Sequence, residues 1–144
     1  MVDHDHYDDA YLRDILATTR SIAVLGASPR PDRPSNGVLG YLTRVGYETY
    51  PVHPGIAGQM LHGRMVYAHL ADIPVPLDMV DVFRNSDAIP AVADEVLALA
   101  VRPKVVWLQL AIRNDNAAKV LEAAGIRVVM DRCPAIERPR LLGR

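Results

Sequence analysis

The sequence is poor in cysteine and in aromatic residues, and it has no long apolar run. Its 144 residues include one cysteine, one tryptophan and one phenylalanine. The single cysteine, Cys133, excludes an internal disulfide and fits a reducing compartment. No apolar run approaches the roughly 18 residues of a membrane span. The first twenty residues also lack the basic and apolar regions of a signal peptide. We therefore expect a cytoplasmic protein.

A surplus of charge of either sign is also missing. Sixteen basic and 17 acidic residues give a formal net charge of −1. The chain thus has no general basic field to attract nucleic acid and no basic tail for a membrane surface. His62 and His69 show no metal-ligand spacing to a cysteine or an acid pair, and His4 and His6, which flank Asp5 like a metal tract, are expected in a disordered acidic terminus. Local arginines and helix ends can still hold a small anion, so we expect a small-molecule ligand as the partner.

Length and composition indicate one globular domain. Half of the residues are apolar and 23% are charged, and 144 residues are enough to bury a core without disulfides or metal. We expect a single domain over residues 1–144. Residues 1–8 and 139–144 are expected to be disordered tails, because they carry no apolar pattern of their own.

Apolar patterns alternate between those of buried strands and those of helices. Continuous apolar runs predict strands at residues 22–25, 47–52, 77–83, 105–110 and 126–130, with a further short strand at 64–67. Apolar stripes at helical spacing predict helices over residues 9–18, 36–45, 87–100 and 115–124. This alternation predicts an α/β fold of the doubly wound, Rossmann-like type. The parallel sheet would have about five strands, with helices on both faces.

Polar residues before these helices predict where each one starts. The expected side-chain caps are Asp8 or Asp9, Ser35 or Asn36, Asn85 or Ser86, and Asn114. On the last two helices, the stripes place Ala100 and Val120 on buried faces.

In an open doubly wound sheet, ligands bind beyond the carboxyl ends of the strands, where the strand order reverses. The turn after the first strand is the strongest candidate here. Gly26 allows a close backbone turn, and a proline-rich loop then leads to a helix start at Ser35 and Asn36. Such a helix start suits a phosphate group, and Arg30 and Arg33 add positive charge nearby.

This turn differs from the fingerprint of dinucleotide-binding proteins. The first strand is followed by Gly-Ala-Ser-Pro, and the next glycine is Gly37. The second strand ends in Pro-Val-His-Pro, without the acidic residue that holds a ribose in such proteins. Both differences argue against ordinary NAD binding.

Taken in order, several short motifs resemble those of a known family. They are SIAVLGAS, RPSNGV, YPVHP, VDVFRNS, VVWLQLAI and VVMDRCP. Over residues 10–138 the chain resembles the stand-alone CoA-binding domain proteins, which are related to the N-terminal CoA-binding domain of the succinyl-CoA synthetase α subunit. The resemblance implies that coenzyme A, or an acyl-CoA, binds along the strand ends.

The resemblance also implies which residues bind. They form a phosphate loop and its continuation, a turn near the adenosine part, and the loops after two later strands: Gly26, Ala27, Ser28, Arg33, Ser35, Asn36, Val52, His53, Pro54, Phe83, Arg84, Asn85, Gln109, Leu110 and Ile112. The chain departs from the family at Ala111, often a glycine, at His53, often an asparagine, and at Asn36, often an aromatic residue. The ligase domain of the synthetase is absent, so we expect no catalytic residues and a sensor or carrier role.

Two alternatives stay open. The fold also permits an NAD(P)-binding redox sensor or minor dehydrogenase. An acyl-transfer enzyme using Cys133 is the other, although a buried, inert thiol is the expectation for this residue. No protein partner follows from the sequence.

Overall fold

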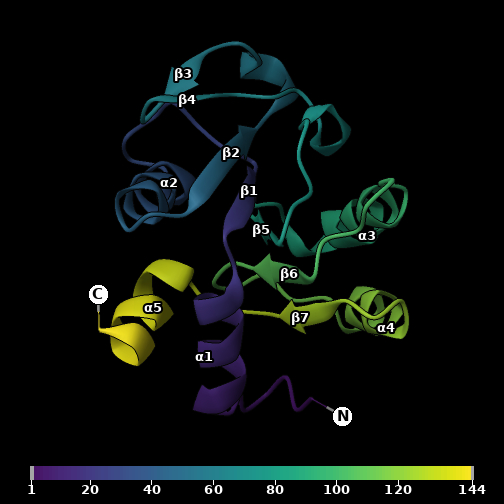
Figure 1. The fold of residues 1–144 in the computed structure, drawn as a ribbon. Helices are drawn as coiled ribbons and strands as arrows, with labels where there is room; N and C mark the ends of the chain where they lie inside the picture. The colour runs from purple at the N-terminus through teal and green to yellow at the C-terminus, as the bar shows by residue number, and fades with distance from the viewer. Residues whose placement is uncertain (1, 144) are drawn as a thin grey trace.

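The computed structural model describes residues 2–143 and contains a parallel sheet as its central layer. Figure 1 shows this sheet with helices on either side. Its strands are β1 (Ser21–Leu25), β2 (Glu48–Val52), β5 (Met79–Val82), β6 (Val105–Leu108) and β7 (Arg127–Val129). The strand order is β2-β1-β5-β6-β7, and all neighbours in it are parallel. The expected doubly wound α/β fold in a single small domain is confirmed.

Helices cover both faces of the sheet. On one face lie α1 (Asp9–Thr18), α2 (Pro34–Arg44) and α5 (Pro134–Leu142), and on the other lie α3 (Ile89–Leu97) and α4 (Asp115–Ala123). Successive strand residues supply the two cores in alternation, so that every residue of β1, β5 and β6 is buried. Burial on both faces explains why these strands read as continuous apolar runs.

The strand order reverses between β1 and β5. From β1 the chain crosses through α2 to β2 on one side, and then returns past β1 to form β5 on its other side. Leu25 at the end of β1 pairs with both Val52 and Val82, so three strand ends lie together. This is the switch point at which doubly wound sheets bind ligands.

A small hairpin lies within the long connection from β2 to β5. The connection contains the 3₁₀ turn η1 (Pro54–Ile56), the antiparallel pair β3 (Met60–Leu61) and β4 (Arg64–Met65), and the turn η2 (Leu70–Asp72). The short strand expected at 64–67 is thus β4, with Tyr67 forming a separate parallel bridge to Val52. Strand β3 was not predicted, because a strand of two residues carries no periodic signal.

Several expected helix caps are wrong. Helix α2 begins at Pro34, so Ser35 and Asn36 lie in its first turn instead of preceding it. Proline suits the first helical position because it lacks the N–H that would otherwise stay unpaired there. At α1, Asp8 holds the cap position without a side-chain hydrogen bond, and Asp9 is already helical.

The start of α3 also differs from the prediction, whereas that of α4 agrees with it. A 3₁₀ turn, η3 (Ser86–Ala88), precedes α3, and the side chain of Asn85 caps neither element. Ser86 instead accepts a hydrogen bond from the backbone of Arg113. At α4 the expected cap is confirmed, since Asn114 Oδ1 accepts the N–H of Ala117 at 2.9 Å.

Two expected core positions and both expected tails need correction; at the N-terminus, Tyr7 is bonded to Met130 and His4 contacts Glu122. Ala100 lies beyond the end of α3, and Val120 is 51% exposed because Ala117, Ala118 and Leu121 form the buried stripe of α4. Residues 139–142, expected in a tail, belong to α5, where Arg140 pairs with Glu137 and Asp9. Residues 1 and 144 lie outside the described part of the chain.

Candidate functional site

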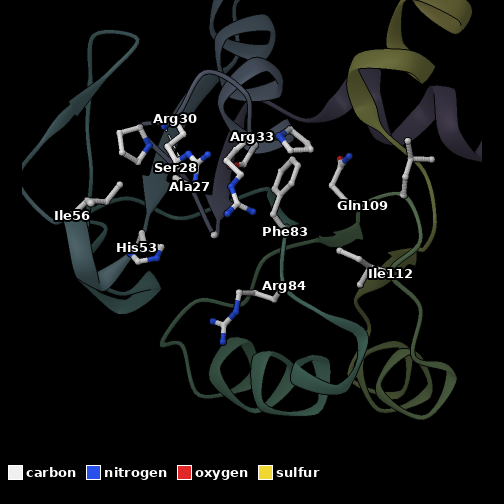
Figure 2. A pocket seen from close by; sticks show the side chains of 15 residues that line it. Ala27, Ser28, Arg30, Arg33, His53, Ile56, Phe83, Arg84, Gln109 and Ile112 are labelled. Atoms are coloured by element: carbon white, nitrogen blue, oxygen red, sulfur yellow. Dashed lines mark hydrogen bonds between the residues drawn. The ribbon is translucent and has the colours of Figure 1, made fainter.

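A pocket of about 610 Å³ opens at the carboxyl ends of β1, β2, β5 and β6. Figure 2 shows its lining from close by. The volume lies within the range of small-molecule sites. The pocket is lined by Gly26, Ala27, Ser28, Pro29, Arg30, Arg33, Pro34, Ser35, His53, Ile56, Phe83, Arg84, Gln109, Leu110 and Ile112.

Most residues predicted from the sequence meet in this pocket. Those that line it are Gly26, Ala27, Ser28, Arg33, Ser35, His53, Phe83, Arg84, Gln109, Leu110 and Ile112. The predicted residues that do not line it are Asn36, Val52, Pro54 and Asn85. Val52 is instead 1% exposed in the core. The predicted set omitted Pro29, Pro34 and Ile56, and Arg30 was expected only as a nearby charge. Pro29, Arg30 and Ile56 lie in loops or turns without a periodic pattern, and Pro34 is the first residue of α2.

Gly26 lets the chain turn closely between the ends of β2 and β5. Its φ is +94°, and its N–H donates to the carbonyl of Val52 at 3.0 Å. A Cβ atom at this position would lie 3.0 Å from the backbone oxygen of Phe83 and 3.3 Å from its Cβ. Both the backbone angle and the space therefore require glycine.

The loop after Gly26 is held by short-range hydrogen bonds. The hydroxyl of Ser28 accepts the N–H of Arg30 at 3.1 Å, and the carbonyl of Ser28 accepts from Asn36 Nδ2 at 2.9 Å. The loop leads into α2, whose N-terminus carries partial positive charge beside the pocket. An anion in the pocket would therefore be stabilised at this side.

Arginine side chains add full positive charge to the same region. Arg30 pairs with Asp32 at 3.0 Å, but both groups are well exposed. Within residues 2–143, the guanidinium groups of Arg33 and Arg84 form no hydrogen bond or ion pair. Figure 2 shows Arg33 between Ala27 and Phe83, with Arg84 projecting at the lower rim of this view. These two cations are free to bind an anionic ligand.

The histidine after β2 supports a turn. His53 Nδ1 accepts the N–H of Gly55 at 2.9 Å, which places the ring proton of a neutral imidazole on Nε2. The backbone N–H of His53 donates to the carbonyl of Tyr67 at 2.9 Å. Figure 2 shows the ring beside Ile56 at the end of the pocket away from Gln109.

The other end of the pocket is apolar, and its backbone takes an unusual conformation. Ala111 has φ +67° and Asp131 has φ +58°, both in the left-handed region. The N–H of Ala111 donates to Asp131 Oδ1 at 2.7 Å, and the N–H of Asp131 donates to the carbonyl of Ile112. These bonds join the loops after β6 and β7, and they set Leu110 and Ile112 against the pocket.

Gln109 contributes a buried polar group to this apolar end. Its side chain is 5% exposed, and its Oε1 has no hydrogen-bond partner among the described residues. A buried acceptor without a partner is costly, so a donor from a ligand would be favoured here.

The sequence over this fold matches the model of one protein family. The model of the CoA binding domain matches residues 20–139. The chain belongs to this CoA-binding domain family. The resemblance drawn from the motifs is therefore confirmed, and membership supports a CoA-binding role in general.

Relatives of this CoA-binding domain cover nearly its whole length. Uncharacterized protein YneT of Bacillus subtilis is 38% identical over 124 residues, which are 86% of this chain and 89% of YneT. The structure of cell-free ID.343 from Thermus thermophilus is 45% identical with a TM-score of 0.87, covering 93% of this chain and 98% of that one. A hypothetical protein from Pyrococcus horikoshii is 35% identical with a TM-score of 0.84, covering 99% and 98%.

Cys133 of this CoA-binding domain lies outside the pocket lining. It is 6% exposed and packs in the core that includes Trp107, whose indole N–H donates to the carbonyl of Arg132 at 2.9 Å. The expected burial of this thiol is confirmed.

Within residues 2–143, no group of three or more His, Cys, Asp or Glu residues is arranged to hold a metal ion. No helix of that same range is long and apolar enough to cross a membrane.

Proposed function

We propose that this domain binds coenzyme A or an acyl-CoA in the pocket at the switch point, as a non-catalytic sensor or carrier in the cytoplasm. The observation that carries the proposal is the pair of unpaired arginines, Arg33 and Arg84, in the lining of the pocket at the switch point. Coenzyme A carries about four negative charges near neutral pH, from a diphosphate and a phosphomonoester. A protein that binds it needs cations that no carboxylate already neutralises.

The donor set on the β1 side fits a diphosphate. The turn at Gly26 brings the loop after β1 against the end of β5, and the N-terminus of α2 lies at the same side of the pocket. Ser28 and Ser35 add hydroxyl groups to the lining. We assign the diphosphate to this side of the pocket, within reach of Arg33.

The apolar side fits the pantetheine arm. Phe83, Leu110 and Ile112 offer apolar surface, and Leu110 is 50% exposed. Gln109 Oε1 is a buried acceptor suited to an amide N–H of the arm. Apolar walls with few placed polar groups are the usual design of small-molecule sites.

A non-catalytic role is supported by the polar contacts inside the pocket. Within the described lining, no hydroxyl is hydrogen-bonded to a histidine or a carboxylate. Ser28 accepts from the backbone of Arg30, and His53 Nδ1 accepts from the backbone of Gly55. A nucleophile would need a base within hydrogen-bond reach, and Cys133 is not in the lining.

Calorimetric titration and thermal unfolding with coenzyme A test this proposal. At a hundredfold excess over Kd, binding stabilises the folded state by about 2.7 kcal/mol, which is read as a higher Tm. Arg33→Ala and Arg84→Ala should each weaken binding about tenfold or more, since each loses a charged hydrogen bond of about 1.5–3 kcal/mol. Arg44→Ala, in the last turn of α2, is the matched control and should bind normally.

Three results would overturn the proposal. Absence of any effect of coenzyme A at millimolar concentration would remove it. Stabilisation by NADH but not by coenzyme A would favour the NAD(P)-binding alternative. An acyl adduct on Cys133 that Cys133→Ala abolishes would favour the acyl-transfer alternative. Native mass spectrometry of the purified protein adds a direct readout, because it shows the mass of any nucleotide that copurifies.

A further inference from the structure

The turn of the β3–β4 hairpin carries a histidine in an unfavourable backbone conformation. His62 has φ +49° and Gly63 has φ +78°, so both residues between the two strands are left-handed. Turns of this kind favour Asn-Gly or Asp-Gly, and a bulkier residue in the first position costs free energy. Such a cost points to a gain elsewhere in the structure.

The imidazole of His62 packs against helix α2 at a glycine. A Cβ built on Gly40 would lie 2.8 Å from Cε1 of His62 and 3.0 Å from its Nδ1. Any side chain at position 40 would therefore push the ring away. Glycine in a helix interior costs about 1 kcal/mol relative to alanine, so this contact is made at the expense of helix stability.

From this position His62 reaches the pocket loop through one intermediate side chain. His62 Nε2 lies 3.0 Å from Asn36 Oδ1, and Asn36 Nδ2 donates to the carbonyl of Ser28 at 2.9 Å. Because an amide oxygen only accepts, Nε2 of His62 is the donor. Asn36 does not line the pocket, whereas Ser28 does.

The hairpin is itself fixed to the sheet. Arg64 Nε donates to the carbonyl of Thr49 on β2 at 2.7 Å, and Tyr67 bridges Val52 at the end of that strand. The N–H of Val66 also donates to the carbonyl of Gln59 at 2.9 Å, which closes the hairpin. A support anchored in this way can hold a loop that has few bonds of its own.

We propose that His62 is a positioning residue for ligand binding: through Asn36 it holds the loop from Ser28 to Arg33 in its binding conformation. The inference rests on the proposed function, since it concerns binding of coenzyme A by that loop. Holding the loop before the ligand arrives reduces the entropy lost on binding. The predicted effect is on affinity and on loop order, while the fold stays intact.

Two substitutions separate the bridge from the fold. His62→Asn introduces a residue that the turn favours. Its side chain is shorter than that of histidine, so it no longer reaches Asn36. Gly40→Ala favours the helix and displaces an exposed ring at its flexible end. Gly37→Ala on the same helix is the matched control, because nothing lies within 4 Å of its added Cβ.

The experiment measures the Kd for coenzyme A, the Tm, and amide hydrogen exchange of Ser28, Arg30, Asp32 and Arg33 before ligand is added, since Pro29 and Pro31 carry no N–H. His62→Asn and Gly40→Ala should each weaken binding about three- to tenfold, as expected for one hydrogen bond. Both should speed exchange in the loop while Tm is unchanged or higher. The double variant should bind coenzyme A no more weakly than whichever single variant has the higher Kd, since both substitutions break the same bridge.

Each outcome decides one claim. Normal affinity and normal loop exchange in His62→Asn would overturn the inference. So would a Gly40→Ala substitution that weakens coenzyme A binding by the same factor in the His62→Asn variant as in the wild type. Wild-type protein that fails to bind coenzyme A would overturn the proposed function instead. The exchange measurement would then still show whether His62 orders the loop, because it needs no ligand.

Discussion

The hydroxyl oxygen of Tyr7 accepts the backbone N–H of Met130 at 2.8 Å, at the open edge of the sheet. Nearby, the hydroxyl of Tyr11 donates to the carbonyl of Val128 at 2.9 Å. Strand β7 is the last in the sheet. The backbone N–H of Arg127 donates to the carbonyl of Lys104 on the β6 side. Because backbone groups alternate in direction along a strand, the N–H and C=O groups of Val128 and Met130 face away from the sheet. Two phenols thus satisfy edge groups that another strand would otherwise pair with.

Removing either phenol hydroxyl should therefore destabilise the protein. We expect Tyr7→Phe and Tyr11→Phe each to lower the free energy of unfolding by about 1 kcal/mol, because each leaves a backbone group without its partner. Burial raises the pKa of Tyr11 to about 12, with smaller contributions from the nearby Glu122 and Tyr7. The hydroxyl therefore keeps its proton near neutral pH and can donate it. Urea denaturation would show lower midpoints with unchanged slopes.

Tyr41→Phe is the matched control for these variants. The hydroxyl of Tyr41 is buried and has no hydrogen-bond partner among the described residues. Its removal should leave the free energy of unfolding unchanged or raise it. Equal losses in all three variants would contradict the role of the edge, since they would show that removing a hydroxyl costs the same whether or not it is bonded to the strand edge.

Gly26→Ala should destabilise the fold and abolish ligand binding together. The left-handed backbone costs about 1–2 kcal/mol for alanine, and the added Cβ must also displace the backbone of Phe83 at 3.0 Å. Gly58→Ala separates the two effects, because Gly58 has φ +89° with nothing within 4 Å of its Cβ. Calorimetric titration and urea denaturation of both variants should show the larger loss, and the loss of binding, only in Gly26→Ala. Normal binding by Gly26→Ala would contradict the close approach.

Asp81 should make the stability of the protein fall as the pH rises. This residue of β5 lies between Val24 and Trp107 in the register, and its oxygens have no hydrogen-bond partner among the described residues. Burial raises its pKa well above the ordinary value of 3.8. The unfolded chain therefore releases this proton at a lower pH than the folded protein does. Its contribution to stability is complete below 3.8 and is lost progressively up to the folded pKa.

Asp81→Asn removes this titration and tests the sign. The free energy of unfolding of the variant should exceed that of the wild type by an amount that grows with pH. Between 3.8 and the folded pKa, the growth should be about 1.4 kcal/mol per pH unit. Urea denaturation of both proteins between about pH 4 and pH 8 measures this difference. A difference that stays constant with pH, or shrinks, would contradict the raised pKa.

The sheet was predictable from the sequence because its strands are buried on both faces. Burial of Ile22, Val24 and their neighbours forces a continuous apolar run, which is visible without knowing what packs against it. The same holds for the turn at Gly26, since glycine after a buried strand marks a backbone that other residues avoid. Helix starts were less predictable. Ser35 and Asn36 are favoured before a helix and Pro34 is favoured at its first position, so the sequence indicates two different starts for α2.

The sequence by itself determined the fold class, the family and the strand ends from which the pocket is built. Only the tertiary structure decided what each side chain does there. It turned Asn36 towards the carbonyl of Ser28, brought Ile56 to the pocket and placed Tyr7 on the edge of β7. Periodicity and turn chemistry act over a few neighbouring residues, whereas these contacts join segments distant in the chain or depend on a single rotamer. Their partners are therefore decided by packing, which no local pattern records.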